Sequence, residues 1–278
     1  MKIGMIGAGK VGVSLGKYFK EKGLDVIGIY SRSERSAEIG ATLMRVNNYF
    51  SQLKELVLES DVLFLTVSDK AIKEVWAQVS RFDLRDKIVC HCSGALSSCV
   101  FEHIRQLGSW GYSVHPVMTI SHKEAYRALE NAPFTLEGDE EKYDIIKGLL
   151  ESLGNPVYEL ASENKSLYHC AAVFSSNFMV ALAQVGMDLL GKCGFDGRER
   201  EIFFPLMSMS VENVLKEGTV GALTGPVERC DVETIGKHLS GLNGEEKDLY
   251  QLLSKVLVGI AEVKNPHLNY EGLKTIID

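Results

Sequence analysis

Apolar runs and helical patterns alternate along the first half of the chain. Short runs rich in β-branched and aromatic residues, each bounded by turn residues, predict strands at residues 2–6, 25–30, 62–66, 87–91, 111–114, 134–136 and 157–159. Helical periodicity predicts helices near residues 10–22, 34–40, 50–59, 70–80, 96–107 and 140–153. Because crossovers of this length favour parallel pairing, the pattern indicates an α/β fold with a doubly wound, mainly parallel sheet.

The pattern changes after Pro156. Residues 162–192 form one long apolar stretch with helical periodicity, and the tail after Asn265 reads as a short extension. Further helices are predicted near residues 197–217, 231–241 and 245–263. We therefore predict two domains, an α/β domain over residues 1–157 and an all-helical domain over residues 158–278.

Composition and charge narrow the classes of function. The 278 residues are 45% apolar and 24% charged, as is typical of a soluble globular protein. The net charge of −7 and the absence of a basic run argue against nucleic-acid binding, which needs a basic stripe. No apolar run approaches the roughly 20 residues that cross a bilayer, so we expect no membrane segment. Six scattered cysteines without disulfide spacing predict reduced thiols in the cytoplasm.

One cluster of cysteines could suggest a metal site. It comprises Cys90, His91, Cys92 and Cys99. Residues 87–92 read as a strand, however, so Cys90 and Cys92 face one side of the sheet and His91 faces the other. We therefore expect no metal.

Residues 7–12 read Gly-Ala-Gly-Lys-Val-Gly, directly between the first predicted strand and the first predicted helix. In that position G-x-G-x-x-G is typical of a Rossmann dinucleotide-binding turn. Gly7 permits the tight turn, Gly9 lets the backbone approach a pyrophosphate, and Gly12 lets the helix pack on the strand. The start of the helix offers free N–H groups to the phosphates. We assign the whole turn, including Ala8, Lys10 and Val11, to the cofactor.

The end of the second predicted strand indicates which dinucleotide binds. An NAD site usually places a carboxylate there to hold the ribose 2′-hydroxyl. This chain instead has Ser31, Arg32 and Ser33, two hydroxyls and a guanidinium that suit a 2′-phosphate. The sequence therefore favours NADP, although Arg32 could also be a solvated surface residue.

Two later strand ends should border the same crevice, because ligands of open α/β sheets bind outside the carboxyl ends of the strands. Thr66, Val67 and Ser68 follow one strand, and Ser93 and Gly94 follow the next. We predict that these residues contact the cofactor.

Polar residues interrupt the long apolar helix on one face. Lys165, His169 and Ser176 lie within about 40° of one another on a helical wheel, and Asn177 lies about 120° from Lys165. Buried polar groups are costly unless partnered, so this face suggests the wall of a polar pocket. A solvated first-turn lysine and a satisfied core histidine are the alternatives. His115, at the end of another strand, is as compatible with a structural role as with a site.

A segment rich in turn residues lies in the second half, at 223–234. Thr224 and Gly225 could present a hydroxyl and backbone N–H groups to a carboxylate, and Arg229 could bind one through two hydrogen bonds. An ordinary connection between helices is the alternative.

Four motifs carry a family resemblance: residues 91–96, 115–116, 165–177 and 223–231. With them the chain resembles Rossmann-like oxidoreductases with a C-terminal helical domain of unassigned function. These are similar to pyrroline-5-carboxylate reductase, 6-phosphogluconate dehydrogenase and non-classical bacterial ketopantoate reductases. The resemblance implies a homodimer through the helical domain. It also implies that Lys165 orients or protonates the reducible group, with His169 as a second proton donor.

One position departs from the family. Cys230 stands where these proteins tend to have glycine, and if that position needs a positive φ, Cys230 implies a shifted turn.

The preferred hypothesis is an NADP-dependent oxidoreductase. Hydride would pass from NADPH to a small 2-oxo or cyclic imino carboxylate, such as ketopantoate or pyrroline-5-carboxylate, bound between the domains. The predicted catalytic residues are Lys165, His169 and Asn177. The predicted substrate-binding residues are His115, Ser176, Thr224, Gly225 and Arg229. The alternative is an NADP-binding redox sensor that does not turn the cofactor over.

Overall fold

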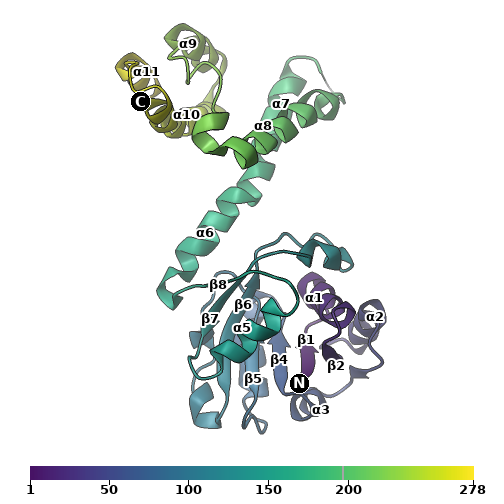
Figure 1. The fold of residues 1–278 in the computed structure, drawn as a ribbon. Coiled ribbons are helices and arrows are strands. Elements are labelled where there is room, and N and C mark those ends of the chain that lie inside the picture. The colour runs from purple at the N-terminus through teal and green to yellow at the C-terminus, as the bar shows by residue number, and fades with distance from the viewer. Residues whose placement is uncertain (196) are drawn as a thin grey trace. The chain divides into compact units, whose positions relative to one another are not determined.

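A computed structural model describes residues 1–195 and 197–278, and the chain divides into two compact units. The first unit is Met1–Asn177 and the second is Phe178–Asp278. The first unit contains an eight-stranded sheet in the order β3-β2-β1-β4-β5-β6-β7-β8 (Figure 1). Its strands are β1 (Lys2–Ile6), β2 (Asp25–Tyr30), β3 (Tyr49–Phe50), β4 (Val62–Leu65), β5 (Ile88–His91), β6 (Trp110–Pro116), β7 (Phe134–Gly138) and β8 (Val157–Glu159).

The sheet is parallel except where β6 pairs with β7. The predicted doubly wound, mainly parallel class is therefore confirmed, and so are its predicted strands. The central strand β4 reads Val-Leu-Phe-Leu and is buried throughout, as expected for a strand covered on both faces. The sequence missed β3, because a strand of two residues is too short to show a period.

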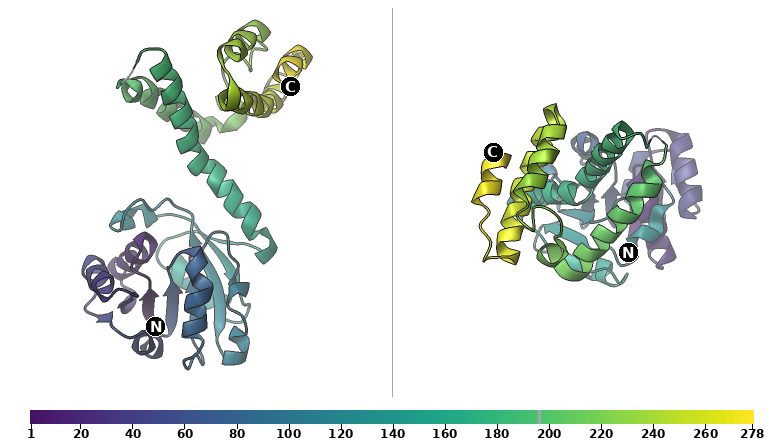
Figure 2. Two further views of the ribbon diagram at one scale, coloured as in Figure 1. Left: turned by 180° about the vertical axis from the view of Figure 1, so that it is seen from behind. Right: turned by 90° about the horizontal axis from the view of Figure 1, so that it is seen from above.

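Two hydrophobic cores lie on opposite faces of this sheet. One face packs against α1 (Lys10–Glu21), α2 (Glu34–Met44) and α5 (Tyr143–Glu151), with Phe19 and Leu150 among the buried contacts. The other packs against α3 (Leu53–Glu59) and α4 (Asp69–Val79). Figure 1 looks onto α5, and the view from behind in Figure 2 shows the blue helix α4 on the opposite face.

The predicted helix at 96–107 is wrong. The segment contains two short 3₁₀ turns instead, η1 (Ser98–Val100) and η2 (Ile104–Leu107). His103 has a positive φ of 63° between them, which no regular helix accommodates. Two further 3₁₀ turns are η3 (Ala125–Leu129) and η4 (Ser162–Asn164).

The long predicted helix over 162–192 is divided in two. α6 (Lys165–Ser175) and α7 (Asn177–Lys192) are separated at Ser176, whose φ of −133° and ψ of −69° are not helical. α6 belongs to the first unit, because Lys165 and Tyr168 bond to the sheet. The first unit therefore extends to Asn177, past the predicted domain boundary at residue 157.

The second unit is helical. It comprises α7, α8 (Glu199–Ala222), α9 (Val232–Gly241), α10 (Gly244–Lys264) and α11 (Glu271–Ile277). Its buried core joins the last three helices to the turn that begins at Leu223. The tail after Asn265 is more than an extension, since α11 buries Leu273 and Ile277 in that core.

The backbone conformation of Cys230 shows how this residue replaces the glycine of the family pattern. It adopts a positive φ of 55°, so the turn keeps its left-handed residue and is not shifted. The Cys230 thiol donates a hydrogen bond to the Asn269 carbonyl oxygen at 3.2 Å, which ties the turn to the tail.

α7 and α8 contrast with the rest of the unit, because neither buries a residue within this chain. Val180, Leu206 and Leu215 are 72%, 62% and 81% exposed. By length and composition alone, Ser162–Lys192 could cross a membrane, which the sequence analysis did not expect. A single such helix is weak evidence, since core helices of soluble proteins pass the same test, and the break at Ser176 interrupts this one.

Candidate cofactor and substrate sites

The glycine turn forms as predicted between β1 and α1. Gly7 has a φ of +113°, and its N–H donates to the Tyr30 carbonyl oxygen at 2.8 Å. A Cβ on Gly12 would collide with the Gly7 carbonyl and the Thr66 hydroxyl, so only glycine lets the helix pack this closely. Gly9 caps α1 without a side-chain bond, which leaves the first N–H groups of the helix available.

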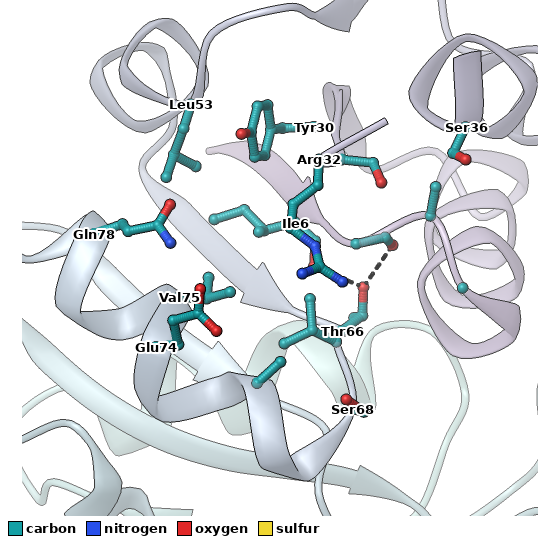
Figure 3. Close-up of a pocket in the computed structure, with 16 residues that line it drawn as sticks. Ile6, Tyr30, Arg32, Ser36, Leu53, Thr66, Ser68, Glu74, Val75 and Gln78 are labelled. Atoms are coloured by element: carbon teal, nitrogen blue, oxygen red, sulfur yellow. Dashed lines mark hydrogen bonds between the residues drawn. The ribbon is translucent and has the colours of Figure 1, made fainter. Parts of the chain in front are cut away.

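A pocket of about 320 Å³ opens in front of this turn (Figure 3). We call it the glycine-turn pocket; its lining residues are Ile6, Gly7, Ala8, Gly9, Tyr30, Ser31, Arg32, Ser36, Leu53, Thr66, Val67, Ser68, Ala71, Glu74, Val75 and Gln78. A Cβ on Gly9 would meet only the Thr66 carbonyl oxygen, at 3.8 Å. Packing within the protein therefore does not require glycine at this position. A backbone left bare toward a pocket fits a phosphate that approaches it closely, as a dinucleotide requires.

The end of β2 supplies the polar side of this pocket. Ser31 and Arg32 line it, and the Arg32 guanidinium has no hydrogen bond or ion pair within the described residues. Ser33 does not line it; its hydroxyl oxygen accepts from the Ser36 N–H and caps α2. Sequence reasoning missed Ser36, although a serine one turn into α2 lies on the same side as its N-cap.

The predicted cofactor residues that follow β4 line the pocket, and one of them also supports the turn. The Thr66 hydroxyl is buried against the carbonyl oxygens of Ile6 and Gly7, at 3.1 and 3.0 Å. Val67 and Ser68 line the pocket, and Ser68 caps α4 without a side-chain bond. Lys10 and Val11 begin α1 but do not line the pocket.

Ser93 shapes the end of β5. Its hydroxyl oxygen accepts from the N–H groups of Ala95 and Leu96, and its own N–H donates to His91 Nδ1 at 3.2 Å. His91 is buried, and burial lowers its pKa to about 4, so the ring is neutral at pH 7. Neither Ser93 nor Gly94 lines the glycine-turn pocket.

The cysteine and histidine cluster does not form a metal site. Within the described residues, no three His, Cys, Asp or Glu side chains are arranged to hold an ion. Burial raises the pKa of Cys92 to about 12, so this thiol is protonated at neutral pH.

Lys165 starts α6 and is buried, with 2% of the residue exposed. Its ammonium donates to the Ser93 carbonyl oxygen at 3.0 Å and to Ser113 Oγ at 2.7 Å. Burial lowers the pKa of Lys165 to about 8, against which the charge of Glu137 acts. The alternative of a solvated first-turn lysine is therefore excluded, and Lys165 joins α6 to β6 and to the loop after β5.

A second pocket, of about 380 Å³, lies beside α6. We call it the histidine pocket; it is lined by His115, Val117, Met118, Thr119, His169, Ala172, Val173, Ser175, Ser176 and Asn177. The structure thus brings together four predicted residues, His115, His169, Ser176 and Asn177, whereas Lys165 lies outside the lining. The Ser176 hydroxyl donates to the Ala172 carbonyl oxygen at 2.6 Å.

Two imidazoles converge at one end of this pocket. A Cβ on Gly94 would lie 2.7 Å from His169 Nδ1 and 2.9 Å from His115 Nε2. His169 Nδ1 is buried without a hydrogen-bond partner. His115 Nδ1 lies 2.7 Å from the Tyr168 hydroxyl, and burial lowers the pKa of His115 to about 4. His169 Nδ1 and His115 Nε2 therefore both lie close to the Gly94 backbone.

Three polar residues of this region were not predicted from the sequence. Ser113 is two residues before His115 on β6, so strand alternation could have placed both on one face. Tyr168 is one turn after Lys165 on α6. Glu137 pairs with Ser113 across the sheet, and its carboxylate accepts from Ser98 and Ser162 at 2.7 and 2.6 Å. No local pattern marks Glu137, because its partners are remote in sequence.

Thr224, Gly225 and Arg229 lie in the second unit, in the turn before α9. The Arg229 N–H donates to the Gly225 carbonyl oxygen at 3.2 Å, which closes the turn. Thr224 and the Arg229 side chain are exposed, so both are available to a ligand.

Comparison with known proteins now identifies the family. A model of the Rossmann-like domain matches residues 1–116, and a model of a domain of unknown function, DUF2520, matches residues 132–257. A Thermotoga maritima protein of known structure is 30% identical, with 95% of this chain and 99% of that chain covered and a TM-score of 0.73. The chain belongs to the DUF2520 family of Rossmann-like proteins. The predicted family resemblance is confirmed.

Other relatives carry names that bear on chemistry. A Bacteroides fragilis protein named as a "putative NADP oxidoreductase" is 26% identical, with 93% of this chain and 98% of that chain covered and a TM-score of 0.73. The fold also matches Plasmodium falciparum pyrroline carboxylate reductase with NADP bound, at 14% identity, a TM-score of 0.57 and coverage of 100% and 98%. The Bacteroides fragilis protein is thus named for NADP and oxidoreductase chemistry, and the Plasmodium falciparum match shows the shared fold.

One curated relative is more distant. A glutamyl-tRNA reductase from Methanococcus maripaludis is 25% identical over 151 residues. The match covers 54% of this chain and 38% of the relative, so the chain spans well under half of that protein's length.

Proposed function

We propose that the protein reduces the carbonyl or imine group of a small 2-oxo or cyclic imino carboxylate with NADPH. The observation that carries this proposal is the order of sites along one edge of the sheet. The glycine-turn pocket lies at the ends of β1, β2 and β4, and the histidine pocket lies at the end of β6. Between them stands β5, which ends at His91 and is followed by Ser93 and Gly94. A dinucleotide site thus leads directly toward a pocket of proton-donating groups.

The residues of the glycine-turn pocket fit NADP. Backbone N–H groups at the start of α1 would hold the pyrophosphate, and the bare Gly9 backbone leaves room for it. Arg32 and Ser31 would bind the 2′-phosphate through charge-assisted hydrogen bonds. When bound, NADPH supplies the hydride.

Lys165 supplies positive charge beside the reacting group. With a pKa of about 8, its ammonium is mostly charged at neutral pH, and it stands at the shared end of β5 and β6. A fixed cation there stabilises negative charge that develops on the substrate oxygen or nitrogen. His169, with an unpaired Nδ1, is the neighbouring proton donor.

Polar groups at the junction of α6 and α7 would hold the substrate carboxylate. Ser176 and Asn177 line the histidine pocket together with the apolar side chains of Val117 and Met118. Thr224 and Arg229 belong to the second unit and are exposed, and they stay predicted substrate-binding residues. An apolar wall with a few polar groups is the usual composition of a small-molecule site.

We propose in addition that the protein is a homodimer through α7 and α8. Neither helix buries a residue in this chain, although both are rich in Leu, Val, Met and Phe. Apolar faces of this extent generally mark an interface. Light scattering after size-exclusion chromatography should give twice the monomer mass of 30.7 kDa. Leu215→Glu should shift the measured mass from the dimer value toward the monomer value.

The test of the reductase function is turnover. Purified protein is incubated with NADPH or NADH and a panel of 2-oxo acids and cyclic imines, and NADPH oxidation is followed by absorbance. We expect oxidation with at least one substrate, with NADPH preferred over NADH. Tight NADPH binding without oxidation against the whole panel would instead favour the redox sensor.

A further inference from the structure

The histidine pocket has two titratable side chains among its described lining residues, His115 and His169. Lys165 does not line it, and its ammonium already donates to the Ser93 carbonyl and to Ser113. The first titratable group that a molecule in this pocket meets is therefore an imidazole. What that imidazole can offer depends on which of its nitrogens carries the proton.

His115 carries a single ring proton at neutral pH. Burial lowers its pKa to about 4, and the positive charge of Lys165 acts in the same direction. His115 Nδ1 lies 2.7 Å from the Tyr168 hydroxyl, with the two rings at 83°. Burial raises the pKa of Tyr168, so the phenol also keeps its proton.

The direction of this hydrogen bond follows from acid and base strength. A phenol is a stronger acid than a neutral imidazole N–H, and an imidazole nitrogen is a stronger base than a phenol oxygen. The Tyr168 hydroxyl therefore donates to His115 Nδ1, and the ring proton resides on Nε2. Nε2 is the nitrogen that faces Gly94, next to the unpaired Nδ1 of His169.

We propose that Tyr168 is a positioning residue that holds His115 as its Nε2–H tautomer, so that the histidine pocket presents this N–H to the substrate. The identity of the accepting atom, a carbonyl oxygen or an imine nitrogen, rests on the reductase function proposed above. Neither a 2-oxo acid nor a cyclic imine has a proton on that atom, so the site needs a donor there. A histidine with its tautomer fixed provides one without first being protonated from solvent.

The proton can pass through the pair without leaving an imidazolate. As charge develops on the substrate atom, the Nε2–H bond breaks and the new O–H or N–H bond forms. At the same time Nδ1 takes the Tyr168 proton, and the electron pair of that O–H bond remains on the phenolate oxygen. Nε2 then takes a proton from solvent, and Nδ1 returns its proton to the phenolate oxygen, which restores both the phenol and the Nε2–H tautomer. Hydride transfer to carbon is the separate contribution of NADPH.

Lys165 is placed to stabilise the phenolate. Its buried ammonium lies 5.8 Å from the centre of the half-buried Tyr168 ring. A fixed positive charge lowers the cost of the transient negative charge. Lys165 would thereby assist proton transfer in the histidine pocket, although it does not line that pocket.

The test reads the tautomer directly. Two-bond ¹⁵N–¹H spectra of the full-length, ligand-free protein separate a protonated ring nitrogen from an accepting one, and His115→Gln assigns the signals. At pH 7 we expect protonated Nε2 and accepting Nδ1 in the wild type, and a mixture of tautomers in Tyr168→Phe. A wild-type ring protonated at Nδ1, or a Tyr168→Phe spectrum identical to wild type, overturns the proposal.

A kinetic arm separates positioning from binding. We expect Tyr168→Phe to lower kcat about tenfold or more, with KM and the Kd for NADPH changed less than about twofold. Tyr158→Phe is the matched control, because Tyr158 lies on β8 and is 60% exposed. Unchanged kcat in Tyr168→Phe contradicts the proposal. If no variant and no wild type reduces any substrate, the reductase function fails, and the tautomer spectra still decide the role of Tyr168.

Discussion

The two pockets of the first unit are constructed in different ways. The glycine-turn pocket is made largely of backbone, with glycines that either permit a close approach or leave space for a ligand. The histidine pocket is made of side chains from β6, from the loop that follows it and from α6. The glycine-turn pocket therefore requires particular residue types at a fixed spacing in the sequence. The histidine pocket requires only that certain residues, remote in sequence, come together in the fold.

The difference also divides the chemical work. In the proposed function, backbone N–H groups would bind an anion that every dinucleotide carries, so we expect the glycine-turn pocket to be general. If the proposed function holds, imidazole and amide side chains would decide which substrate reacts, so we expect the histidine pocket to be specific. Variants in the first should therefore change affinity for NADPH, and variants in the second should change turnover.

The largest expected effect is on turnover. Replacing Lys165 by Met removes the buried cation but keeps much of the side-chain volume. We expect kcat to fall by about 10²–10³, with the Kd for NADPH changed less than about threefold. Lys147→Met on α5 is the matched control, since this lysine is 42% exposed. Wild-type turnover in Lys165→Met would remove the lysine from the mechanism.

The next effect is on cofactor affinity. Gly9→Ala places a methyl group in the glycine-turn pocket, where it meets little of the protein itself. We expect the melting temperature to stay within about 2 °C and the Kd for NADPH to rise by about two orders of magnitude, or about 3 kcal/mol. A thermal melt measures the melting temperature, and isothermal titration calorimetry measures the Kd for NADPH.

Gly12→Ala sharpens that comparison, because its methyl group meets the Gly7 carbonyl and Thr66. This variant should lose about 1–3 kcal/mol of unfolding free energy as well as affinity. Equal loss of stability in Gly9→Ala and Gly12→Ala would show that Gly9 serves packing rather than a ligand.

A smaller effect concerns the choice of dinucleotide. Arg32→Ala removes the only cationic side chain that lines the glycine-turn pocket among the described residues. The Kd for NADPH should rise about 10- to 30-fold, while that for NADH should change less than about twofold. Arg35→Ala, on the neighbouring turn of α2, is the control. An equal loss for both dinucleotides would contradict a 2′-phosphate contact.

The smallest effect is on acid stability. The folded-state pKa of His115 is about 4 against an ordinary 6.5, so the unfolded chain binds more protons between these values. The unfolding free energy should therefore fall as the pH decreases from 6.5 to 4, with this site contributing at most about 1.4 kcal/mol per pH unit. Denaturant melts of His115→Gln should show a shallower decrease than wild type. Identical slopes would show that His115 is not buried in its neutral form.

The glycine-turn pocket could be predicted from the sequence more fully than the histidine pocket, because its residues belong to one local turn. Gly7, Gly9 and Gly12 are readable because their spacing is imposed by one local turn. The strands are readable for the same reason, since the period of two is local. The two-residue strand β3 and the break at Ser176 are not, because each depends on neighbouring elements rather than on its own pattern.

The histidine pocket is readable only in part. Wheel geometry grouped His169 and Ser176 correctly, since both lie on one face of α6 and its end. It also grouped Lys165 with them, but the ammonium turns to Ser93 and Ser113 of the sheet. Tyr168 and Glu137 have no local signal, because their roles depend on His115 and Ser162, which other segments supply.

The most direct test of the central claim is transfer of a labelled hydride. NADPH that carries deuterium at the transferable position of the nicotinamide is incubated with wild-type protein and the best substrate of the panel. Mass spectrometry then locates the label. We expect deuterium on the former carbonyl or imine carbon, and far less of it in reactions with Lys165→Met at matched times. Tight binding of NADPH with no label in any product would contradict the account.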